Sequence, residues 1–311
     1  MKQEAIEMTS RNIPYSIVDV FTRSPFAGNP VAVIHDASDL SAKEMQSITI
    51  EFGFSESTFV LPSQDTTFAA RVRIFTPIDE IPFAGHPNIG TAFTVVTQDT
   101  AAGAMSDSEF IFDEIGGSVS VSIEHENDLP VGARIVAPQA LEVFGECEPG
   151  LMAGCLGLPV SSLRDSRFNP CVASVGLPFA FVEVEDLAAL AGIVPDIPLF
   201  QKAKSVGPET VDGFAICAFA VIGENTDEIN LRSRVISPLG SPPEDPATGS
   251  ASGALAALLA PPERTRNFRV NIEQGVEMGR ASQITVNMRA DSNCPEIVGN
   301  CVLVSTGTLH L

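Results

Sequence analysis

The sequence predicts an α+β protein of two similar, pseudo-symmetric domains, each a β-barrel-like sheet wrapped around a central helix. Three observations lead to this fold class. The chain has 311 residues, more than one hydrophobic core usually serves. Its pattern of strands and turns recurs after about 150 residues, as in a duplicated fold. Each copy also contains a stretch without charge, at 87–98 and 247–262, which is typical of a helix buried by surrounding strands.

In the first domain, β-branched residues between turn formers indicate the strands. A helix is expected to begin at Ser41, where Ser-Ala-Lys-Glu forms a capping box, and to end at Gly53. The expected strands cover residues 15–21, 29–34, 55–61 and 69–75, and two more lie within 108–123.

The second domain repeats the first. Gly-Leu-Pro-Phe-Ala-Phe-Val at 176–182 matches Gly-Asn-Pro-Val-Ala-Val-Ile at 28–34 in spacing and character. A short helix and two strands follow, as in the first copy. We place the N-terminal domain at 1–130, with about the last ten residues as a candidate extension of it, and the C-terminal domain at 131–311.

Both uncharged segments begin with the same chemistry. His86-Pro87 and Asp245-Pro246 each put a polar residue at an expected N-cap and Pro at the first helical position. The unpaired N–H groups of the two helices would point at the space between the domains. Two such helix ends suit the carboxylate of a small molecule. Taken singly, each polar residue is explained by capping alone, but the matched pair favours a site.

The composition excludes several function classes. A formal net charge of −21 argues against nucleic acid or an anionic membrane as partner, because both require patches of Lys and Arg. The N-terminus has no apolar run of the signal-peptide kind. Six cysteines are scattered without a Cys-x-x-Cys pair, which predicts reduced, buried thiols and a cytoplasmic protein.

Glu56 is the candidate for acid–base chemistry. It lies in Phe-Ser-Glu-Ser-Thr-Phe at 54–59, an apolar strand with alternating small polar residues. A carboxylate turned into an apolar pocket has a raised pKa, which suits a group that takes and returns a proton near neutral pH. From the pattern alone, an outward position on an exposed strand face is favoured over this role.

Other chemistries have thin support. Residues 85–90 have the glycine spacing of a phosphate-binding loop, but Thr91 and Ala92 replace the required Lys-Ser/Thr, and no Gly-x-Gly-x-x-Gly follows a strand. The four histidines lie far apart without metal-ligand spacing, so no metal is expected. Of these, His35 and His125 are interpreted as surface residues.

Three motifs in order resemble one family. Phe-Ser-Glu-Ser-Thr-Phe at 54–59, Phe-Ala-Gly-His-Pro-Asn-Ile-Gly at 83–90 and Glu-Asp-Pro-Ala-Thr-Gly-Ser-Ala at 244–251 resemble the PhzF-like, phenazine-biosynthesis-like isomerases. The match extends from Val-Asp-Val-Phe-Thr at 18–22 to Glu-Gln-Gly-Val-Glu-Met-Gly-Arg at 273–280. The ordered set is specific to the family, although no single motif is.

The resemblance implies a diaminopimelate-epimerase-like fold with the active site in the cleft between the domains. It also implies a homodimer and an isomerase without metal or organic cofactor. In the phenazine enzyme a glutamate moves a proton within a dihydro-hydroxyanthranilate, converting a dienol system toward a reactive ketone. By motif this base is Glu56, assisted by His86 and Asp245. The expected substrate contacts are Ser55, Asn29, Gly85, Gly249 and Ser250.

The sequence departs from the family pattern at three places. Asn88 stands where Thr is common, Ser252 stands where His is frequent, and Ser-Pro-Pro at 241–243 replaces a more usual lead that contains Gly. All three are expected beside the pocket. They leave the identity of the small carboxylate substrate open, and a phenazine precursor is not assumed.

Three alternatives remain at this stage. A racemase of the same fold would carry a Cys at the start of each central helix, and residues 83–91 and 244–251 contain none. A PhzF-like scaffold recruited for cyclisation or elimination in specialised metabolism would share the same site. A non-catalytic relative that binds a small molecule or a protein is disfavoured by the presence of Glu56, His86 and Asp245.

Overall fold

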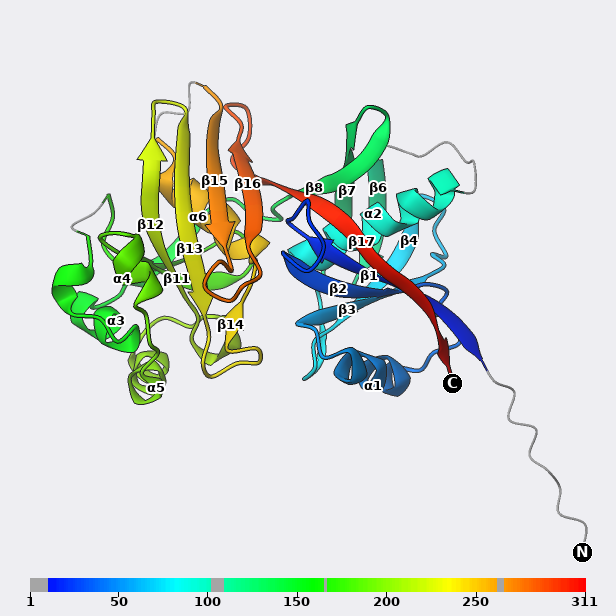
Figure 1. The fold of residues 1–311 in the computed structure, drawn as a ribbon, viewed down its shortest axis with the longest axis horizontal. Helices are drawn as coiled ribbons and strands as arrows, with labels where there is room; N and C mark the ends of the chain where they lie inside the picture. The colour runs from blue at the N-terminus through cyan, green and yellow to red at the C-terminus, as the bar shows by residue number, and fades with distance from the viewer. Residues whose placement is uncertain (1–10, 102–108, 165–166, 262–265) are drawn as a thin grey trace, which may run out of the picture.

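The computed structural model describes residues 11–101, 109–164, 167–261 and 266–311, which form two β-sheet halves side by side (Figure 1). The N-terminal half contains β1 (Asn12–Val20), β2 (Asn29–Ile34), α1 (Ala42–Phe52), β3 (Glu56–Leu61), β4 (Ala70–Phe75), β5 (Glu80–Ile81), α2 (Gly85–Ala101), β6 (Glu109–Glu114), β7 (Gly117–Glu126) and β8 (Leu129–Val136). The C-terminal half contains β9 (Glu142–Glu146), α3 (Pro149–Cys155), β10 (Cys171–Ser174), β11 (Pro178–Glu183), α4 (Leu187–Ala191), α5 (Ile197–Val206), β12 (Ile216–Glu224), β13 (Glu228–Ile236), β14 (Glu244–Asp245), α6 (Gly249–Leu259), β15 (Phe268–Gln274) and β16 (Ser282–Met288), and β17 (Glu296–His310) runs through both halves.

The N-terminal half is a closed barrel around α2. Within the described residues its strand order is β1-β2-β3-β4-β6-β7-β8-β17, and β17 pairs again with β1. The helix α2 contacts strands on several sides of the barrel. Ile89, Ala92 and Val96 of α2 have no exposed surface. The uncharged stretch at 87–98 thus belongs to a helix in which residues 86–94 are all buried.

The C-terminal half repeats this plan around α6. Its sheet has the order β9-β10-β11-β12-β13-β15-β16, followed by the first residues of β17. Parallel pairs occupy equivalent places in the two halves: β2–β3 matches β11–β12, and β4–β6 matches β13–β15. Because α6 consists of Gly, Ser, Ala and Leu, the strands can pack closely on it. The predicted α+β fold class is confirmed.

The remaining helices cover the outer surfaces of the two sheets (Figure 1). The helix α1 begins at Ser41 with the predicted capping box, in which Ser41 and Glu44 satisfy each other's backbone N–H groups, and it ends at Gly53 with φ 67°. One expectation here was wrong. His35 is only 9% exposed, because it packs against β1: its N–H donates to the Pro14 carbonyl at 2.9 Å, and its Nε2 lies 2.9 Å from the Ser16 hydroxyl.

The strand β17 holds the two halves together. Its first residues pair with β16 and with β8, and the rest pairs with β1 from Cys301 to His310. The boundary expected between residues 130 and 131 lies inside β8, and the division into domains stays a prediction.

β8 and β17 approach closely, since a Cβ on Gly132 would lie 2.1 Å from the Gly299 carbonyl oxygen.

This close approach predicts that Gly132→Ala destabilises the protein. The new methyl group must push β8 away from β17, because the atom it meets is backbone and cannot rotate aside. We expect a loss of about 2 kcal/mol in the free energy of unfolding, as is typical of overpacking. Urea unfolding would measure it, and Gly117→Ala serves as the comparison because a Cβ there meets nothing within 4 Å, although its φ of 114° adds backbone strain. A Gly132→Ala variant as stable as the wild type would contradict the prediction.

Candidate active site

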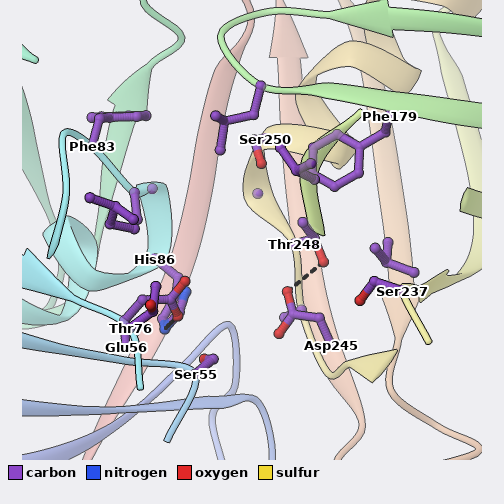
Figure 2. Close-up of a pocket in the computed structure, with 18 of the residues that line it drawn as sticks. Ser55, Glu56, Thr76, Phe83, His86, Phe179, Ser237, Asp245, Thr248 and Ser250 are labelled. Atoms are coloured by element: carbon purple, nitrogen blue, oxygen red, sulfur yellow. Dashed lines mark hydrogen bonds and ion pairs between the residues drawn. The ribbon is translucent and has the colours of Figure 1, made fainter. Parts of the chain in front are cut away.

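A cavity of about 220 Å³ lies between the two halves, at the starts of both central helices. This volume suits a small metabolite. Gly85 and His86 from α2 line one side, and Gly249 and Ser250 from α6 line the other. Phe83 and Phe179 contribute apolar walls from opposite halves (Figure 2). Among the described residues at the cavity wall there is no Lys or Arg, so an anionic group would rely on the backbone N–H groups of the helix starts.

The cavity brings together seven of the eight residues expected at the site. They come from distant segments in both halves of the chain: Ser55, Glu56, Gly85, His86, Asp245, Gly249 and Ser250. Asn29 does not line the wall, because its side chain lies behind Asp245 and is only 1% exposed.

Glu56 and His86 form the N-terminal side of the site (Figure 2). Glu56 is the first residue of β3, and its Oε2 lies 3.6 Å from His86 Nε2, slightly beyond hydrogen-bond distance. The Glu56 side chain retains 19% of its exposure, whereas that of His86 retains 7%. Glu56 thus faces the cavity and does not lie on an outer strand face, which the strand pattern alone had favoured.

His86 is neutral at physiological pH. Burial lowers its pKa to about 4, although the nearby Asp245 carboxylate opposes this shift. Its position in the first turn of α2 also disfavours a positive charge. A neutral imidazole can donate or accept a hydrogen bond without adding charge to the cavity.

Asp245 forms the facing side of the site. Its Oδ2 accepts a hydrogen bond from Thr248 Oγ1 at 2.6 Å (Figure 2). Its Oδ1 accepts one from Asn29 Nδ2 at 2.8 Å. Burial raises the pKa of Asp245 to about 7, and the charge of Glu56 adds to the rise. The charge state of Asp245 therefore depends on both Glu56 and His86.

The helix starts differ from the prediction. Asp245 does not cap α6, since the N-cap is Thr248, and Asp245 instead belongs to the short strand β14 that pairs with Val235 of β13. His86 is the second residue of α2, which begins at Gly85. The Pro246-Ala247 step separates Asp245 from the helix, and this leaves its carboxylate available to side chains across the cavity.

Asn29 connects the two halves behind the cavity wall. Its Nδ2 donates to Asp245 Oδ1 and to the Ala247 carbonyl at 2.9 Å, and it lies 3.5 Å from His86 Nδ1. Its Oδ1 accepts a hydrogen bond from Ser55 Oγ at 3.2 Å. Asn29, the first residue of β2, thus joins the site residues of both halves.

The sequence analysis did not predict a role for Gln274. Its position within the family motif at 273–280 was the only indication that it belongs to the site. It is fully buried, and its Nε2 donates to the Asp245 carbonyl at 2.8 Å and to Thr248 Oγ1 at 3.0 Å. Its Oε1 accepts a hydrogen bond from the Thr248 N–H at 3.1 Å. Gln274 therefore fixes the segment that carries Asp245.

Two of the three departures from the family pattern lie away from the cavity wall. Asn88 and Ser252 are buried in the barrel interiors and do not line the cavity. Ser241 and Pro242 do line it, next to Ser237. Of the three, only the Ser-Pro-Pro segment is therefore placed to touch a substrate.

The fold and the site define a class: proteins with two similar halves, each a curved sheet around a central helix, and a cluster of Glu, His and Asp in the cavity between them. The family model for phenazine biosynthesis-like protein (PhzC-PhzF) matches residues 18–307. The chain belongs to this family. It is 36% identical over 307 residues to the trans-2,3-dihydro-3-hydroxyanthranilate isomerase of Pseudomonas aeruginosa, covering 96% of this chain and 99% of that one. At this identity over nearly the full length, the chain is an isomerase.

Solved structures support the fold independently. The phenazine biosynthesis protein of the PhzF family from Bacillus anthracis superposes with a TM-score of 0.82 at 23% identity, covering 97% of this chain and all of that one. A hydroxyproline epimerase from Agrobacterium vitis gives a TM-score of 0.58 at 14% identity and covers 98% of this chain and 93% of its own. The predicted epimerase-like fold is confirmed.

Two features are absent from the described residues. The described residues contain no helix long and apolar enough to cross a membrane. The same part of the chain has no group of three or more His, Cys, Asp or Glu side chains placed to hold a metal ion.

Proposed function

We propose that the protein moves a proton between carbon atoms of a small carboxylate substrate, with Glu56 as the general acid and base. The observation that carries this proposal is the placement of Glu56 at the cavity wall, 3.6 Å from a buried neutral His86 and across from Asp245. Glu56 as carboxylate takes a proton from one carbon, and the electron pair shifts within the substrate. Glu56 then returns the proton to another carbon, so that atoms and charge balance as an isomerisation requires.

The other groups hold the substrate during this transfer. His86 and Asp245 bond to its polar groups; the position of both at the cavity wall supports this role. The N–H groups at the starts of α2 and α6 bind its carboxylate, which the presence of Gly85, Gly249 and Ser250 at the cavity wall supports. A cyclic compound related to trans-2,3-dihydro-3-hydroxyanthranilate, the substrate in the name of the relative from Pseudomonas aeruginosa, fits this chemistry.

The cysteines offer no support for a racemase with two thiols. No cysteine lines the cavity within the described residues, and five of the six are buried. Burial raises the pKa of Cys217 to about 12, which disfavours the thiolate. A cytoplasmic location and a homodimer stay predictions.

Turnover of trans-2,3-dihydro-3-hydroxyanthranilate in deuterated water tests the proposal. Because the Glu56 side chain is partly open to solvent, its proton exchanges, and the product should carry deuterium at the carbon that receives it. Proton NMR and mass spectrometry locate the label, and the relative from Pseudomonas aeruginosa serves as the positive control. A product of unchanged mass apart from deuterium supports an isomerase acting on this substrate. Loss of water or a new ring would support the recruited scaffold instead, and an unchanged substrate would contradict this substrate assignment.

A further inference from the structure

The loop between β15 and β16 contacts both halves of the site. Its start and end are Gln274 and Ser282, which pair with each other across the two strands. Gln274 binds Asp245 and Thr248, and Ser282 Oγ donates to the Pro246 carbonyl at 2.8 Å. The base of this loop therefore holds the segment 245–248 of the C-terminal half.

Arg280, near the end of the loop, reaches the N-terminal half. Its Nη2 donates to Asp19 Oδ1 at 2.6 Å and to the Ala27 carbonyl at 3.1 Å, and its Nε donates to the Gly28 carbonyl at 2.9 Å. The Gly28 N–H returns a hydrogen bond to the Ala281 carbonyl at 3.2 Å. The turn before Asn29 is thus bound from both sides by one loop of the other half.

Asp19 completes this contact from inside the N-terminal half. Its side chain is only 3% exposed, and its Oδ2 accepts a hydrogen bond from the Phe26 N–H at 2.6 Å. Without Arg280 this buried carboxylate would lose the only ion pair that it makes among the described residues. It would then have to take up a proton or move toward water.

We propose that Arg280 is a positioning residue: by holding the turn at 27–28, it sets the approach of Asn29 to Asp245 and so aligns the two sides of the site. Arg280 itself does not line the cavity. Its effect passes through the backbone to the next residue, Asn29, whose amide bonds to Asp245 and whose carbonyl oxygen accepts from Ser55. A planar guanidinium can bond to a carboxylate and two carbonyls at once, whereas an ammonium group cannot keep this geometry. The inference rests on the proposed function for its kinetic consequence, but not for its structural one.

The kinetic test compares Arg280→Ala, Arg280→Lys and the control Arg269→Ala. Arg269 lies on β15 of the same hairpin and is exposed, and within the described residues its side chain bonds only to the neighbouring Asn287. Since a displacement of about 1 Å costs roughly 10²-fold in rate, we expect Arg280→Ala to lower kcat about 100-fold with little change in KM. Arg280→Lys should recover part of the loss, and Arg269→Ala should behave as the wild type. Equal loss of kcat in the Lys and Ala variants, or kcat per folded molecule within twofold of the wild type in both, would overturn the proposal.

A second readout needs no substrate. The side-chain amide of ¹⁵N-labelled Asn29, assigned through its absence in Asn29→Asp, should shift and exchange faster with solvent in Arg280→Ala but not in Arg269→Ala. An unchanged Asn29 signal would overturn the positioning role even if the proposed reaction is correct. A changed signal in Arg280→Ala, together with a wild-type protein that does not turn over the substrate, would instead contradict only the proposed function. Should Arg280→Ala fail to fold, Arg280→Lys carries both measurements.

Discussion

Glu56→Gln is expected to lower kcat about 10³-fold, because the amide cannot accept a proton from carbon and general acid–base catalysis contributes gains of this order. The change keeps the size of the side chain, so the cavity and its apolar walls should persist. KM should change little, since binding of the carboxylate is assigned to the helix starts and not to Glu56. Turnover of trans-2,3-dihydro-3-hydroxyanthranilate, followed by absorbance or NMR, gives both constants.

Glu51→Gln is the matched control for this experiment. Glu51 lies on the exposed face of α1, outside the cavity, and should tolerate the same replacement without loss. A Glu56→Gln variant that keeps the full rate on a substrate turned over by the wild type would show that another group is the base. The coupled carboxyl of Asp245 would then be the next residue to test.

Glu114→Gln is expected to stabilise the protein at alkaline pH. Glu114 is the last residue of β6 and only 6% exposed, next to the side chain of Asn88 in the barrel interior. Burial raises its pKa to about 8, above the ordinary value of 4.5. The folded state therefore holds this proton more tightly than the unfolded state does. Stability from this group is fully present below about pH 4.5 and falls as the pH rises toward 8.

Gln cannot ionise, so the variant escapes this loss. We expect it to exceed the wild type by roughly 4 kcal/mol in free energy of unfolding at pH 8, and by little near pH 4.5. Urea unfolding at both pH values measures the difference. Glu109→Gln, on the exposed start of the same strand, should shift stability equally little at either pH. A pH-independent effect of Glu114→Gln would show that Glu114 does not carry the buried proton.

Local sequence signals predicted the elements that depend on neighbouring residues. The capping box at Ser41 and the stop at Gly53 need only residues within α1, and both are present in the structure. The uncharged segments predicted α2 and α6 as buried helices, because a helix without a charged face is stable when it is buried. The prediction that Asp245 caps α6 was wrong because Asp before Pro is a common N-cap sequence. Only the three-dimensional structure shows that Asp245 belongs to β14 and that Thr248 is the N-cap.

The candidate site was harder to predict than the helices, because its contacts join residues that lie far apart in the sequence. Asn29 and Asp245 lie 216 positions apart, so no local pattern could reveal their hydrogen bond. The burial of Glu114 was invisible for the same reason, because a charged residue at a strand end is normally solvated. The strand pattern at Glu56 favoured an exposed position, and only the order of several motifs favoured the site; in the structure its side chain lies beside His86 of α2, 30 positions along the chain.

The shared strand β17 has a consequence for how this protein is made. The N-terminal barrel is closed by a strand synthesised after the entire C-terminal half, so β1 and β8 leave the ribosome without the partner that joins them. Contacts between such distant segments slow folding, and unpaired strand edges invite association with other chains. The N-terminal barrel therefore stays open until β17 has been synthesised. Because β17 also pairs with β16, the two halves of the site are expected to form at the same time.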